Sequence, residues 1–221
     1  MSDLHHAANS SGHLAVVAGE QPPGKRDDAA VHQTLERAAI RVVPLGLAAL
    51  ESIGEAPEWS AELTVLPVFS DERPLQGLAG VLDWRLGGRL SSLLREGICT
   101  GTIGEHVLTL SRHTPVLWRV VLLGLGERAG FDSARAQAAA AQVLELCSNL
   151  CVQEVMLGMP AIAPTLPVPE AGLWWAQAVV RARQDALARG AIAPEKLWIL
   201  AERGHLEQTQ VELATAAGGA N

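Results

Sequence analysis

Residues 116–132 read Val-Leu-Trp-Arg-Val-Val-Leu-Leu-Gly-Leu-Gly-Glu-Arg-Ala-Gly-Phe-Asp and lead into an alanine-rich segment. The apolar run Val116–Leu123 has the length and composition of a buried strand. The segment Phe131–Cys151 carries apolar residues at helical spacing, and Asp132 is a favourable N-cap for it. A buried strand that turns through glycines into an amphipathic helix is a building unit of α/β proteins.

The same alternation of strand and helix patterns continues on both sides of this unit. Runs typical of buried strands cover Ile40–Leu45, Leu63–Phe69, Glu105–Leu110, Gln153–Met159 and Lys196–Ala201. Helical patterns cover Leu173–Arg189, Leu206–Ala217 and Pro74–Leu94, the last with a break at Gly87-Gly88. Because a short polar segment separates Glu105–Leu110 from Val116–Leu123, this pair is expected to be antiparallel. The pattern predicts a three-layer α/β/α fold with a mixed, largely parallel sheet.

One domain with two tails is the organisation we expect along the chain. Residues 1–37 are polar apart from Leu14–Ala18, so they predict a flexible N-terminal tail. A single α/β domain is expected over residues 38–217, followed by a C-terminal tail at 218–221. Several of the 7 histidines lie in the N-terminal segment, but their spacing matches no tetrahedral metal site, and a solvated polar tail is the preferred interpretation.

Composition and charge argue against several classes of partner. The chain has 221 residues, enough for a sizeable core, and its 17 Lys+Arg against 24 Asp+Glu give a net charge of −7. The basic doublet Lys25-Arg26 is followed at once by Asp27-Asp28. We therefore expect no nucleic-acid binding, which needs clustered basic residues, and no binding to an anionic membrane surface. No apolar run reaches the roughly 18 residues that a membrane span needs.

The cysteines and the N-terminus point to the cytoplasm. Three cysteines are an odd count in a chain large enough to fold without disulfides, so we expect reduced thiols. Cys147 and Cys151 share a helix face and are interpreted as buried core thiols rather than metal ligands. Residues 1–12 show neither the basic start nor the apolar stretch of a signal peptide.

The glycine-rich turn is the main candidate for a ligand site. Gly124, Leu125, Gly126, Glu127 and Arg128 stand between a strand and a helix, where free N–H groups can bind an anion. The spacing misses G-x-G-x-x-G by one residue, no P-loop lysine follows, and a tight structural turn is the preferred alternative. The second candidate is Ser70 with Asp71 of the acidic pair Asp71-Glu72, which follows a strand end where α/β proteins place ligands. The alternative for this pair is a solvated loop.

Adjacent tryptophans mark a candidate interaction surface. Trp174 and Trp175 point about 100° apart on a helix, so one of them is expected in the core. If Trp175 is the buried one, Trp174 lies beside Arg181 on a mixed surface, which is the composition of an interface hot spot. The alternative is a purely structural Trp174 that covers residues 164–169.

No catalytic motif stands out from the residues themselves. The sequence contains neither a G-x-S-x-G elbow nor an H-E-x-x-H pair, and its carboxylates are scattered. The sequence therefore predicts no catalytic residue, no metal site and no cofactor.

Four segments in order resemble the N-terminal domain of the M17 leucyl aminopeptidase family. Leu82-Asp-Trp-Arg-Leu-Gly-Gly-Arg-Leu90 is similar to the family's L-D-x-x-L-G-G-x-L helix. Arg119-Val-Val-Leu-Leu-Gly-Leu-Gly126 is similar to its R-V-L-L-V-G-L-G strand. Leu63–Phe69 and Gly104–Leu110 are similar to two further strands, and the weaker resemblance extends over residues 38–217.

This resemblance implies a macro-domain-like fold and, by itself, no peptidase chemistry. The family's catalytic half holds two metals and includes an N-T-D-A-E-G-R segment, which nothing here matches, so an active metalloaminopeptidase is the least favoured of three functions. Macro domains bind ADP-ribose with the help of an Asn-rich loop, and the strand end at 68–72 contains no Asn. We therefore expect a non-catalytic interaction, regulatory or assembly module, in contact with a protein partner or with copies of itself. The alternative is a binder of a nucleotide-like anion at residues 124–130.

Overall fold

The computed structural model describes residues 28–45, 61–111, 118–160 and 170–218. They contain a six-stranded sheet in the order β1-β6-β5-β2-β4-β3. The strands are β1 (Ile40–Pro44), β2 (Leu63–Val68), β3 (His106–Ser111), β4 (Trp118–Gly124), β5 (Glu154–Gly158) and β6 (Lys196–Ala201). Neighbouring strands are parallel except β3 and β4, which are antiparallel. The predicted mixed, largely parallel sheet and its antiparallel pair are confirmed.

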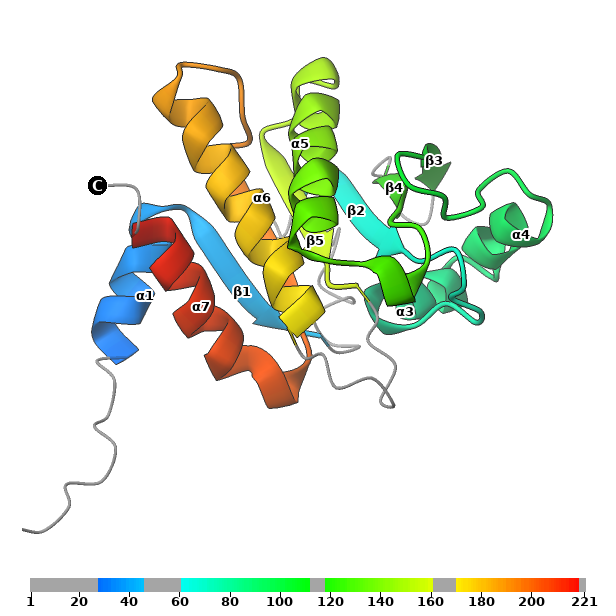
Figure 1. Ribbon diagram of the computed structural model, residues 1–221, viewed down its shortest axis with the longest axis horizontal. Coiled ribbons are helices and arrows are strands. Elements are labelled where there is room, and N and C mark those ends of the chain that lie inside the picture. The colour runs from blue at the N-terminus through cyan, green and yellow to red at the C-terminus, as the bar shows by residue number, and fades with distance from the viewer. Residues whose placement is uncertain (1–27, 46–60, 112–117, 161–169, 219–221) are drawn as a thin grey trace, which may run out of the picture.

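Helices cover both faces of this sheet, which gives the expected three layers (Figure 1). The helices are α1 (Asp28–Arg37), α3 (Gly77–Arg85), α4 (Arg89–Arg95), α5 (Ser133–Asn149), α6 (Glu170–Ala188) and α7 (Leu206–Gly218). Two single 3-10 turns, η2 (Arg128–Gly130) and η3 (Arg203–His205), precede α5 and α7. One layer is formed by α1, α5, α6 and α7, and the other by α3 and α4.

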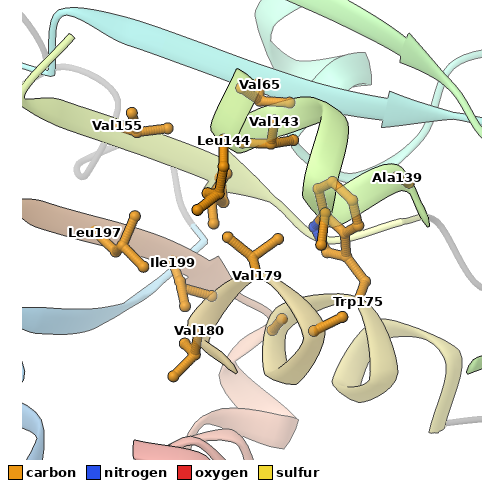
Figure 2. Close-up of a cluster of buried hydrophobic side chains, with 14 of the residues drawn as sticks. Val65, Ala139, Val143, Leu144, Val155, Trp175, Val179, Val180, Leu197 and Ile199 are labelled. Atoms are coloured by element: carbon orange, nitrogen blue, oxygen red, sulfur yellow. The ribbon is translucent and has the colours of Figure 1, made fainter. Parts of the chain in front are cut away.

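The larger of the two cores lies under α5 and α6. Figure 2 shows side chains of both helices meeting those of β2, β5 and β6. Trp175 is fully buried there, and its Nε1 donates a hydrogen bond of 3.0 Å to the carbonyl oxygen of Gly158 at the end of β5. Because a buried indole N–H needs an acceptor, this bond fixes how α6 lies on the sheet.

The N-terminal boundary of the domain differs from the expectation. The sequence predicts a flexible tail to residue 37, whereas residues 28–37 form α1, which packs against α7. Val31 and Leu35 are four residues apart and so share one helix face; Leu35 is buried in the main core, and Val31 is partly buried against it. Two apolar residues in a polar segment are enough to hold a short helix when a neighbouring helix offers a surface. The remainder of the expected tail, residues 1–27, lies outside the described residues.

The expected break at Gly87-Gly88 is confirmed and has a capping function. Gly88 has a φ of 80° and stands at the N-cap of α4, a conformation that glycine adopts without strain. Its lack of a side chain leaves the α4 N-terminus without a local cap. The carboxylate of Asp83 replaces it, because its Oδ1 accepts a hydrogen bond of 2.9 Å from the backbone N–H of Ser91. This part of the L-D-x-x-L-G-G-x-L segment is therefore structural.

Candidate functional site

The ends of β2 and β4 bring the two predicted ligand segments together. These strands are parallel neighbours, with Val68 opposite Gly124, so both continue into loops at the same edge of the sheet. The backbone N–H of Ser70 donates to the carbonyl oxygen of Gly126 at 2.9 Å. The backbone N–H of Arg128 donates to Oδ1 of Asp71 at 3.0 Å. Ser70 and Asp71 thus contact the glycine-rich turn directly, which the sequence did not indicate.

The backbone amides of this turn are largely used inside the protein. The N–H of Gly126 donates to the carbonyl oxygen of Gly101 at 2.8 Å, and the N–H of Gly124 donates to the carbonyl oxygen of Glu105 at 2.8 Å. The N–H of Leu125 donates to the carbonyl oxygen of Val68 at 2.9 Å. An anion-binding loop needs amides that point at the ligand. Here these amides tie the turn to two neighbouring segments.

Close backbone approach explains why glycines are needed at this turn. A Cβ added at Gly124 would lie 2.1 Å from the carbonyl oxygen of Thr102. A Cβ added at Gly126, where φ is +79°, would lie 2.5 Å from Cγ1 of Ile103. No side chain fits at these distances without movement. The glycine pattern is therefore accounted for by the packing of residues 99–105 on the turn.

An anion-binding nest does occur beside the turn, and the chain's own carboxylate occupies it. Oε2 of Glu105 accepts hydrogen bonds from the backbone N–H groups of Thr100 (2.7 Å), Gly101 (2.8 Å) and Thr102 (3.3 Å). The hydroxyl of Thr100 donates to the same oxygen at 2.8 Å. Partial burial alone would raise the pKa of Glu105, but these hydrogen bonds outweigh it and lower the pKa below its usual range. Glu105 thus acts as an internal anion that holds this loop.

A buried ion pair lies under the same edge, and sequence reasoning missed it. The Glu72 side chain is 1 % exposed, and the Arg128 side chain is 14 % exposed. Nη2 of Arg128 lies 3.8 Å from Oε2 of Glu72, and the guanidinium carbon lies 5.1 Å from the centre of the Phe69 ring. Glu72 follows Asp71 in an acidic pair that looks solvated in the sequence, so nothing there indicated burial.

The two members of this pair are satisfied to different degrees. The carboxylate of Glu72 accepts hydrogen bonds from the backbone N–H groups of Phe69 (3.3 Å) and Gln76 (3.0 Å). Burial nevertheless raises the pKa of Glu72, against these hydrogen bonds and the nearby guanidinium of Arg128. Nε and Nη2 of Arg128 are buried without a hydrogen-bond partner among the described residues. A guanidinium with free donors is the one feature of this edge that suits an anionic ligand.

The predicted interaction residues lie on the opposite layer from α3 and α4, between α5 and α6. Trp175 is in the core, as expected for one of the two tryptophans, and Trp174 is half-buried against its margin. A groove of about 380 Å³ is lined by Ser133, Gln137, Trp174, Gln177, Ala178, Arg181, Ala182 and Asp185. Arg181 and Asp185 are exposed. The geometry therefore places Trp174 and Arg181 in one groove.

The thiols only partly follow the expectation of buried residues. Cys147 is buried, and desolvation raises its pKa to about 12. Cys99 is buried too, and desolvation likewise raises its pKa. Cys151 is exposed, so the interpretation of both helix thiols as core residues is wrong for this one. The physical reason is that α5 ends at Asn149, and Cys151, with a φ of 51°, lies in the turn beyond the helix face.

Residues 28–45, 61–111, 118–160 and 170–218 contain no group of three or more His, Cys, Asp or Glu side chains that could hold a metal ion. None of their helices has the length and apolar character needed to cross a bilayer.

The fold and the segments around this edge define a relative of the aminopeptidase N-terminal domains. The model of the cytosol aminopeptidase family, N-terminal domain, matches residues 65–187. Since this is more than half of the chain, the protein belongs to that family. The match confirms the resemblance found in the sequence.

Two similar aminopeptidases agree with this assignment and are much longer than this chain. A probable cytosol aminopeptidase from Gloeothece citriformis is 29% identical over 111 residues, which are 49% of this chain and 22% of that protein. A mutant of tomato leucine aminopeptidase has the same fold, with 16% identity and a TM-score of 0.54 over 80% of this chain and 35% of that one. The macrodomain of Thermus aquaticus DarG gives 16% identity and a TM-score of 0.45 over 73% of this chain and 97% of that one. The chain thus spans about a fifth to a third of the aminopeptidases it matches.

Proposed function

We propose that this cytosol aminopeptidase N-terminal domain works as a cytoplasmic assembly module without catalysis of its own, and that it associates with a second copy through the α5–α6 groove. The observation that carries the proposal is the half-buried Trp174 at the margin of that groove. Tryptophan and arginine are the residues most enriched where binding energy concentrates in protein interfaces. At the sheet edge, by contrast, the amides of the glycine-rich turn are already bonded within the protein.

Charge supports a second copy as the occupant of the groove. Arg181 and Asp185 are exposed, lie four residues apart on α6 and carry opposite charges. When two α6 helices meet antiparallel about a two-fold axis between these positions, each arginine lies opposite the aspartate of the other copy. Such self-complementary pairing is what an isologous interface requires. It also brings Trp174 of each copy towards the other molecule.

The test is the molar mass in solution, measured by light scattering on the full chain. Trp174→Ala should shift the assembly towards smaller species while the far-ultraviolet circular dichroism stays intact. Trp84→Ala is the matched control, since Trp84 is 75% exposed on α3 in the other layer and should leave the mass unchanged. A folded Trp174→Ala variant that assembles like the wild type contradicts the proposal.

A charge exchange tests the orientation of the two helices. Arg181→Asp places like charges opposite each other and should weaken the assembly, as should Asp185→Arg alone, while mixing the two variant proteins should restore it. Such rescue is not expected if Arg181 merely stabilises its own helix, because each variant then carries like charges at positions 181 and 185 of the same helix. Failure of the rescue would therefore contradict reciprocal pairing.

A second candidate function is supported by one observation, the unpartnered donors of Arg128. Its Nε and Nη2 are buried, so a diphosphate at the edge formed by β2 and β4 would bind them only after the Arg128 side chain turns away from Glu72. A ligand that binds only the native state stabilises it by about 2.7 kcal/mol at a hundredfold excess over Kd. A thermal-shift titration with inorganic diphosphate and with ADP-ribose, repeated on Arg128→Gln, tests this candidate. If neither compound raises the Tm of the wild type, the second candidate is contradicted and the assembly role remains as the proposed function.

A further inference from the structure

The strand β3 is the outer strand at one end of the sheet and is unusually apolar on its exposed side. Among the described residues, β4 is the one strand that pairs with it. Leu108 is 44% exposed and Leu110 is 51% exposed. Natural proteins usually protect an edge strand with charges, prolines or bulges, because its free peptide groups invite another strand. The sequence His106-Val-Leu-Thr-Leu-Ser111 contains none of the charged residues Lys, Arg, Asp and Glu, and no proline.

The hydrogen-bond pattern shows which peptide groups of β3 face outwards. The backbone N–H of Gly124 donates to the carbonyl oxygen of Glu105, so Glu105 directs its peptide groups at β4. Peptide groups alternate along a strand, and the register continues without interruption to Ser111. The N–H and C=O groups of His106, Leu108 and Leu110 therefore point away from β4. Their outer side is open to another strand as far as the described residues extend.

The exposed leucines lie on the face of the sheet that α5 covers elsewhere. Leu108 is opposite Val121 and His106 is opposite Leu123 in the β3–β4 register. Val121 and Leu123 belong to the core under α5, and directly opposite residues of antiparallel strands project to the same face. Since Leu108 remains 44% exposed, the cover provided by α5 does not extend fully over β3.

We propose that β3 pairs antiparallel with β3 of a second copy of this chain, about a two-fold axis at Leu108. In this register Leu108 lies opposite Leu108 of the other copy, and His106 lies opposite Leu110. By symmetry, Leu110 also lies opposite His106. Each of the resulting three pairs exchanges two N–H···O bonds, and the exposed leucines of both copies meet on one face. The sheets of the two copies become continuous across the axis.

The distribution of charge supports a second copy of the chain, rather than nonspecific hydrophobic association, at the β3 edge. The chain carries a net charge of −7, so two copies repel each other unless they meet through a surface without like charges. The outward residues of β3 are two leucines and a histidine, and the two-fold axis places no acidic side chains of the strand against each other. The hydrogen bonds of the three pairs fall in the range of about 10 ± 5 found in specific interfaces.

The inference rests on the proposed assembly role but uses a surface separate from the α5–α6 groove. Leu108→Lys places two ammonium groups at the axis and should reduce the molar mass in light scattering by removing this contact. Trp84→Lys is the matched control, because Trp84 is 75% exposed on α3 in the other layer and belongs to neither proposed contact. A loss of mass in Leu108→Lys with none in Trp174→Ala supports the β3 contact and contradicts the groove, and the reverse result overturns the β3 contact alone. A wild type that stays monomeric at high concentration overturns both.

Cross-linking tests the register and does not depend on a disruptive variant. In a Cys151→Ser background, which removes the exposed native thiol, Leu108→Cys should form a disulfide-linked dimer on mild oxidation. Leu110→Cys should not form this dimer, because residue 110 lies opposite His106 of the other copy. The two residues at position 110 are therefore four positions apart along the paired strands. The pair His106→Cys and Leu110→Cys, mixed as two proteins, should again cross-link. Equal yields for the Leu108 and Leu110 variants would overturn the proposed axis.

Discussion

Replacing Gly126 by Ala should destabilise the fold with no ligand present. Gly126 has a φ of +79°, and an L-residue in this left-handed region costs about 1–2 kcal/mol. The new Cβ would stand 2.5 Å from Cγ1 of Ile103. Because Ile103 is 54% exposed, its side chain can move away from the new Cβ into an off-rotamer conformation, at a cost of about 1 kcal/mol. The expected loss is therefore about 2–3 kcal/mol, which lowers Tm by roughly 4–12 °C for a domain of this size.

Two other glycines separate the backbone cost from the packing cost. Gly190 has a φ of +68° and nothing within 4 Å of the added Cβ, so Gly190→Ala should show the backbone cost alone. Gly124→Ala would place its Cβ 2.1 Å from the carbonyl oxygen of Thr102, and backbone yields less easily than a side chain. Thermal and urea denaturation should give the largest loss for Gly124→Ala, less for Gly126→Ala and least for Gly190→Ala.

A reversed order would refute this reasoning. If Gly126→Ala is less damaging than Gly190→Ala, the contact with Ile103 does not limit the turn. An unchanged Tm together with loss of diphosphate or ADP-ribose binding would assign the glycine to ligand capture. That result would favour the second candidate function over the assembly role.

Two further predictions concern titratable side chains. Burial raises the pKa of Glu72 above its ordinary 4.5, so the folded state favours the protonated form, and stability should fall as the pH rises through the raised pKa. The Tm of the wild type minus that of Glu72→Gln should therefore decrease as the pH rises from 4.5 through the raised pKa, and a constant difference would contradict the burial effect. A thiol reagent should modify exposed Cys151 rapidly, and Cys99 and Cys147 only on unfolding. Rapid modification of more than one thiol would contradict the buried positions.

The sheet and its layers could be predicted because hydrophobic pattern and turn residues agree over most of the chain. Asp132 illustrates this, since the predicted N-cap accepts a hydrogen bond of 2.9 Å from the backbone N–H of Arg135. The helix α1 was missed because its two large apolar residues, Val31 and Leu35, are too few for a local signal. Its partner α7 lies at the other end of the sequence, so the contact that stabilises α1 is invisible to a local pattern.

Buried charges were the part of the structure that the sequence could not indicate. Arg183 is 5% exposed, and its Nε and Nη1 donate to the carbonyl oxygens of Pro194 (2.6 Å) and Ala38 (2.8 Å). It ties α6 to two loops, and desolvation lowers its pKa. The burial of Glu72 and Arg128 likewise depends on where two loops cross, which sequence spacing does not encode. The candidate segments at 70–71 and 124–128 were found individually, and their contact was not.

The two proposed surfaces together constrain the assembly. One lies along the sheet edge at β3 and the other on α6, so a copy can use both at once. Each contact is isologous, and two such contacts close into a ring of four copies only if their two-fold axes intersect at right angles. If the axes do not meet, copies add without limit and the mass grows with concentration. Because Leu108→Lys and Trp174→Ala each remove one contact, either variant should then stop at a dimer, and the double variant should be a monomer.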